Sequence, residues 1–128
     1  MNIIDLNNTI KGNVPLINFY LILKEEIISY KDLSSKKGST VPIVVQGKLD
    51  EDIIITTDFL LKVLVLLKND IRYIEFISYV CDALLLIDNA DFATDKVKDC
   101  IESLCDSEFL KTINTDKLNK MIGELSKK

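Results

Sequence analysis

The chain contains 128 residues, with 16 lysines and arginines against 20 aspartates and glutamates, and 48% of its residues are apolar. This length suits a single domain over residues 1–128, which can bury about two-thirds of its unfolded surface without disulfides or a structural metal. The formal charge of −4 disfavours nucleic acid or an anionic membrane as a direct partner, and the absence of histidine excludes Ser-His-Asp catalysis and histidine-containing zinc sites.

The basic residues also disfavour nucleic acid as a partner, and the cysteines predict reduced thiols. Arg72 is the only arginine, although arginine is the preferred residue for bidentate phosphate contacts. Cys81, Cys100 and Cys105 form an odd set without CxxC spacing, which predicts reduced core residues. The first residues lack a basic stretch followed by an apolar one, so we expect no signal peptide and a cytoplasmic protein.

The first half of the chain predicts two helices separated by an ambiguous segment. Apolar residues recur every three or four positions over residues 15–30, and Pro15 suits the first turn of that helix. Two β-branched runs flank a polar stretch near residues 43–56, where either a short hairpin or a loop fits. Thr57 then offers a cap for a helix over residues 59–67 that is apolar on nearly all sides and therefore belongs in the core.

The second half predicts three more helices. They cover residues 70–87, residues 94–105 with Thr94 as the cap, and a last segment that begins at Thr115. Five helices predict an all-α fold, a compact helical bundle. Whether residues 43–56 add a short hairpin to it stays undecided on the sequence.

The clearest surface feature is a row of acidic residues on the helix predicted over residues 94–105. Asp95, Asp99, Glu102 and Asp106 follow a spacing of 0, 4, 7 and 11, which places them on one side of a helix. Residues 88–108 hold seven carboxylates against two lysines, a local charge of −5. This side is either a solvated face or a docking surface for a basic protein. Because the four carboxylates extend over about 16 Å, they cannot converge on one ion, and we expect no metal or cofactor.

Aromatic residues on the preceding helix offer a second candidate feature. Tyr73, Phe76 and Tyr79 are spaced three apart, and a tyrosine beside Glu75 and Asp82 suits an interface anchor, although core packing is the simpler interpretation. No glycine-rich phosphate loop or activated nucleophile is present in the sequence, so we expect no catalytic residue. The predicted partner-binding residues are Glu75, Tyr79, Asp82, Asp88, Asp91, Asp95, Asp99, Glu102 and Asp106.

Several of these segments together resemble a known family. The run Tyr-Val-Cys-Asp-Ala-Leu at residues 79–84, then Asp91-Phe92, then Asp106-Ser107-Glu108, is similar to small immunity proteins of bacterial contact-dependent inhibition and related polymorphic toxin systems. The resemblance covers roughly residues 57–125, with Cys81 in place of alanine and Ser107 in place of proline. It implies a noncatalytic cytoplasmic inhibitor that binds the C-terminal domain of one cognate toxin, frequently a nuclease, and blocks its active site.

Two other functions remain open on the sequence. A helical adaptor would bind a partner peptide or helix in an apolar groove walled by residues 59–67 and 73–85. An enzyme would require a buried carboxylate pair with a raised pKa, which a sequence does not show.

Overall fold

The computed structural model describes residues 1–34 and 45–126, and of these it leaves aside the side chains of residues 30–34 and 107. Helices dominate this part of the chain, which confirms the predicted mostly helical fold. In chain order the elements are α1 (Ile3–Ile10), α2 (Leu16–Ser34), β1 (Ile53–Ile55), α3 (Thr57–Asn69), the 3-10 turn η1 (Ile71–Tyr73), α4 (Ile74–Leu86), β2 (Ala90–Phe92), α5 (Asp95–Cys105), α6 (Ser107–Lys111) and α7 (Thr115–Ser126). The described residues thus form seven α-helices instead of five, because α1 and α6 were not expected.

Short polar side chains fix where several helices begin. The Asn2 side chain starts α1 by accepting hydrogen bonds from the backbone of Ile4 and Asp5. Helix α3 is capped by Thr56, whose hydroxyl accepts from the Phe59 amide at 3.2 Å, and not by Thr57 as predicted. Helix α7 likewise begins after Asn114, whose side chain accepts from the Lys117 amide at 2.9 Å. The predicted cap at Thr115 was therefore wrong by one residue.

The small sheet corrects the hairpin predicted near residues 43–56. Strand β1 pairs in parallel with β2, with Ile53 opposite Ala90 and Ile55 opposite Phe92. Parallel strands require a long crossover, which α3 and α4 supply here. Residues 43 and 44 lie outside the described residues, and Gln46 forms an isolated bridge with Asn2. The second β-branched run is thus a strand, but its partner lies between the helices predicted over residues 70–87 and 94–105.

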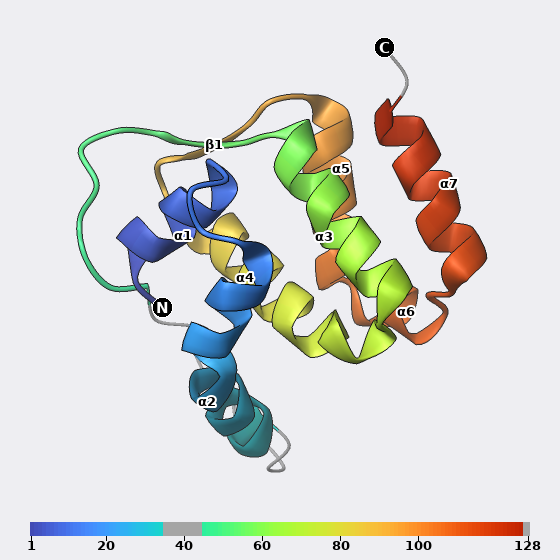
Figure 1. The fold of residues 1–128 in the computed structure, drawn as a ribbon, viewed down its shortest axis with the longest axis horizontal. Coiled ribbons are helices and arrows are strands. Elements are labelled where there is room, and N and C mark those ends of the chain that lie inside the picture. The colour runs from blue at the N-terminus through green and yellow to red at the C-terminus, as the bar shows by residue number, and fades with distance from the viewer. Residues whose placement is uncertain (35–44, 127–128) are drawn as a thin grey trace.

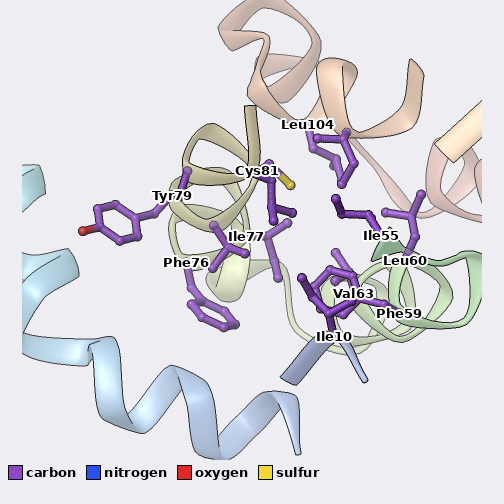
Figure 2. Packing of buried hydrophobic residues seen from close by; sticks show 14 of the residues in the cluster. Ile10, Ile55, Phe59, Leu60, Val63, Phe76, Ile77, Tyr79, Cys81 and Leu104 are labelled. Atoms are coloured by element: carbon purple, nitrogen blue, oxygen red, sulfur yellow. The ribbon is translucent and has the colours of Figure 1, made fainter. Parts of the chain in front are cut away.

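The core is one cluster to which β1 and most helices contribute, and Ala90 and Phe92 of β2 pack against it. Ile53 and Ile55 are completely buried, whereas Ile54 between them is exposed, as expected for alternating strand positions. Figure 2 shows Ile55 packed among residues of α3, α4 and α5, with Leu60 and Leu104 beside it. The buried strand therefore ties the crossover helices to α5.

The helices pack in pairs around this cluster. Helix α3 lies beside α7, and α4 packs against α5 (Figure 1). Helix α2 packs against α1 and α4, and its second half extends beyond the other helices in the same view. Two edge-to-face ring contacts join α2 to α4, Phe19 with Phe76 at 6.2 Å and Tyr20 with Phe76 at 5.2 Å between ring centroids.

Candidate functional site

Helix α5 presents the acidic residues because its two sides differ strongly in polarity. The Thr94 hydroxyl caps the helix by accepting from the Val97 amide at 3.2 Å. Val97, Ile101 and Leu104 are completely buried, which confirms the predicted inner face. Burial of this face fixes the rotation of the helix, so the opposite side must point to solvent.

The acidic stripe, defined as Asp95, Asp99, Glu102 and Asp106, lies on that outer side. All four residues are exposed. Within residues 1–34 and 45–126, no ion pair forms to Asp95, Asp99 or Glu102. The negative charge of the stripe is therefore not neutralised by a neighbouring cation in the described fold, and it is available to a partner of opposite charge.

Asp106 caps a helix in addition to carrying a charge. Its carboxylate accepts a hydrogen bond from the Glu108 amide at 3.0 Å and caps α6. Glu108 also pairs with Lys111 at 3.3 Å, although both side chains are largely exposed. The C-terminal end of the stripe thus forms the turn between α5 and α6.

Asp82 adjoins this end of the stripe from α4. Partial burial raises the pKa of the Asp82 carboxyl above its usual value of 3.8, and a smaller opposing effect comes from a hydrogen bond with Cys105, the residue before Asp106. Asp88 and Asp91, on either side of the start of β2, are exposed. These three predicted residues therefore flank α5, Asp82 near its end and the other two before its start.

Two predicted residues do not extend the surface. Tyr79 is only 3% exposed, and its hydroxyl donates a hydrogen bond to Glu26 on α2, so the residue predicted as an interface anchor lies inside the described fold and not on its surface. Figure 2 shows the Tyr79 ring at the edge of the apolar cluster, with its hydroxyl pointing away from the other labelled side chains. Glu75 is exposed but lies in the first turn of α4, whereas Asp82, which adjoins the stripe, lies in the second half of that helix.

Two of the three cysteines, Cys81 and Cys100, are buried in surroundings that make their thiols unreactive. Burial raises the pKa of the Cys100 thiol to about 12. A hydrogen bond with Cys105, together with burial, holds the pKa of Cys81 well above its ordinary value. Because the thiolate is the nucleophile and metal ligand, neither thiol is activated at neutral pH. In the described ranges, no group of three or more carboxylate or thiol side chains is placed to hold a metal ion.

A shallow groove between α5 and α7 borders the stripe, and it was not predicted from the sequence. It has a volume of about 310 Å³, and its lining includes Asp99, Cys100, Met121 and Leu125. The Lys96 ammonium donates to the Glu124 carbonyl oxygen across it at 3.5 Å. The groove is formed by the packing of α5 against α7, and no local sequence motif predicts such packing.

A second, larger groove has the apolar character that the adaptor hypothesis requires, and residues 59–67, one of the two predicted walls, line it. Its volume is about 640 Å³, and it lies between the outer face of α3 and the segment that joins α1 to α2. Residues 73–85, predicted as the other wall, do not line it. Its lining residues are Thr9, Gly12, Val14, Pro15, Leu16, Ile17, Phe59, Leu61, Lys62, Val65, Leu66 and Asn69.

In comparisons with known proteins, no family model matches the chain, and no curated protein or solved structure matches it. Of the helices that the structure describes, none combines the length and apolar character needed to cross a membrane.

Proposed function

We propose that this chain is a noncatalytic immunity protein that acts in the cytoplasm by binding a basic toxin domain, a nuclease, and covering its active-site cleft. One observation carries the proposal, namely that Asp95, Asp99 and Glu102 line the exposed side of α5 without an ion-pair partner in the described residues. The family resemblance of residues 57–125 supports the same assignment.

Charge complementarity explains how such a surface would work. A nuclease cleft is basic because it binds phosphate, so a rigid row of carboxylates can occupy the positions of successive phosphates. Long-range attraction raises the association rate, whereas exposed charges add little to the strength of the final complex. Inhibition therefore combines electrostatic guidance by the stripe with steric coverage of the cleft by the helices around it.

No chemical step by this chain is needed. An enzyme would require a buried carboxylate pair, whereas the polar neighbour of the partly buried Asp82 is the Cys105 thiol. Asp82, together with Asp88 and Asp91, instead extends the negative potential of the stripe at its two ends.

The test uses the C-terminal domain of a large toxin encoded immediately upstream of this gene. Coexpression should protect cells from that domain, and the two proteins should copurify. A variant with Asp95, Asp99 and Glu102 replaced by lysine should associate at least about tenfold more slowly at low salt and depend less on salt, since steering scales with surface charge. Circular dichroism should show unchanged helicity.

A matched control separates the stripe from net charge. Replacement of Glu25, Asp50 and Asp52, all exposed and outside α5, by lysine also changes the formal charge from −4 to +2. This control should keep more of the association rate than the stripe variant. Equal slowing of both variants would remove the stripe from the mechanism, and a lack of any protection by the unmodified protein would end the proposal.

A further inference from the structure

Helix α2 carries large apolar residues on more sides than the described chain covers. Phe19, Leu23 and Ile27 point into the core. Leu21, Ile22 and Ile28 remain 63%, 58% and 52% exposed. Large apolar side chains that are exposed together mark a surface that another element can cover.

Part of this surface has the spacing of a helix-packing seam. Ile17, Leu21, Lys24 and Ile28 follow one another at intervals of four, three and four residues, which places them in one narrow band along α2. Ile22 lies outside the band, on the side of Asn18 and Glu25. The apolar positions are therefore arranged as they would be against a second helix.

The seam joins the larger groove directly. Ile17 belongs to the seam and also lines the groove, whose opposite wall is Leu61, Val65 and Leu66 of α3. Val65 is itself 45% exposed. Seam and groove thus form one continuous apolar surface bounded by two helices, which suits a helix better than an extended strand.

The charges on this surface are positive, unlike those of the acidic stripe. Lys62 is the charged residue that lines the groove, and Lys24 occupies the third seam position. Neither lysine forms an ion pair among the side chains that the structure describes. A partner segment with carboxylates at its edges would satisfy both.

We infer that the surface formed by α2 and α3 binds an amphipathic helix of a partner protein, with apolar residues at intervals of three and four and acidic residues that meet Lys24 and Lys62. This surface differs from the acidic stripe on α5 and requires a partner of opposite charge, so the inference goes beyond the proposed function. A parallel pairing of two copies through α2 would place Lys24 against Lys24, which disfavours that arrangement.

The experiment follows backbone amides of the full-length ¹⁵N-labelled protein by NMR, at physiological salt, while a synthetic amphipathic helix of leucine, alanine and glutamate is added. The glutamate peptide should shift amides of α2 and α3. A matched peptide with lysine in place of glutamate should bind these residues at least about threefold more weakly, since two ion pairs become two repulsions.

Two neighbouring substitutions provide the control. Leu21→Asp should weaken binding of the glutamate peptide at least about tenfold, because it places a charge in the seam. Ile22→Asp changes an almost equally exposed residue outside the seam and should weaken binding less than about twofold. Because both side chains are exposed, thermal unfolding should show that both variants fold.

Several results would overturn the inference. These are an absence of shifts in α2 and α3, equal effects of the two substitutions, or stronger binding of the lysine peptide at these residues. Self-association of the protein, or binding to neutral lipid vesicles, that Leu21→Asp abolishes would assign the surface to a second copy or to a membrane instead. Shifts of α5 amides with the lysine peptide would report binding to the acidic stripe. They bear on the proposed function and do not count in this test.

Discussion

The hydroxyl of Tyr79 donates a hydrogen bond to the carboxylate of Glu26, which links the centre of α4 to α2. The same carboxylate oxygen lies 2.7 Å from the amino group of Met1. A buried tyrosine generally finds a partner for its hydroxyl, and this partner explains why Tyr79 faces inward and not toward the acidic side of α4. Glu26 thus gathers two polar groups at the edge of the apolar core.

Replacement of Tyr79 by phenylalanine should lower the free energy of unfolding by about 1 kcal/mol, because the ring stays buried while one hydrogen bond is lost. Urea denaturation measures this difference. Tyr73→Phe is a suitable control, since Tyr73 is half-buried and makes its described contact through the ring, 5.0 Å from the ring of Tyr20. Equal destabilisation by the two substitutions would show that the link to Glu26 does not contribute to stability.

Asp82 should make stability depend on pH. Burial raises the pKa of this carboxyl in the folded protein above 3.8, so the folded state holds the proton more tightly than the unfolded chain. The ionised form therefore destabilises the fold at neutral pH, and this cost disappears once the pH falls below 3.8. Asp82→Asn should stabilise the protein at pH 7 and lose that advantage at about pH 3.

The test compares the urea midpoints of the unmodified protein and of Asp82→Asn at several pH values. The difference between variant and unmodified protein isolates Asp82 from the other carboxylates, which titrate in both. A constant difference over this range would show that the ionisation of Asp82 does not affect stability.

The sequence predicted the features that depend on helical periodicity. The inner face of α5 and the exposure of Asp95, Asp99 and Glu102 follow from residue spacing alone, because only one side of that helix is apolar. The buried face of α2 was predicted only in part. Leu23 and Ile27 belong to the apolar periodicity over residues 15–30 and are buried, but apolar residues also occur outside that face. Only the structure shows that Phe19 is internal, where it packs against Phe76.

Features that depend on long-range contacts were missed. Strand β2 contains three residues, too few for a periodic pattern, and its partner Ile53–Ile55 lies on the other side of two helices in the sequence. The two grooves also require the positions of α3, α5 and α7 in space. Helix α1 did carry a usable signal, since Asn2 is a strong helix cap before an apolar run.

Two glycines should respond to alanine in opposite directions. Gly123 lies inside α7, and a β-carbon added there meets nothing within 4 Å, so Gly123→Ala should stabilise the protein by about 0.5–1 kcal/mol. Gly47 has a φ of +96°, and an added β-carbon would lie 3.2 Å from the Ile3 side chain. Gly47→Ala should therefore destabilise by about 1 kcal/mol or more. Differential scanning calorimetry would reveal both changes, and a lower melting temperature for Gly123→Ala would contradict the open environment of that residue.

The two roles of Asp106 can be separated by two substitutions. Asparagine caps a helix as well as aspartate does, so Asp106→Asn should leave the free energy of unfolding within about 0.3 kcal/mol, whereas Asp106→Ala should lower it by about 1 kcal/mol. Both variants remove the same charge. If this residue belongs to the toxin-binding surface, both should slow association with the toxin domain about twofold at low salt.

Stopped-flow association and urea denaturation on the same three proteins complete the comparison. Slower association in both variants, with a loss of stability only in Asp106→Ala, assigns both roles to Asp106. Asparagine preserves the hydrogen bond from the Glu108 amide. An unchanged association rate in Asp106→Asn would therefore show that Asp106 caps α6 but does not contribute to toxin binding. The acidic stripe would then end at Glu102, and the turn into α6 would lie outside the interface.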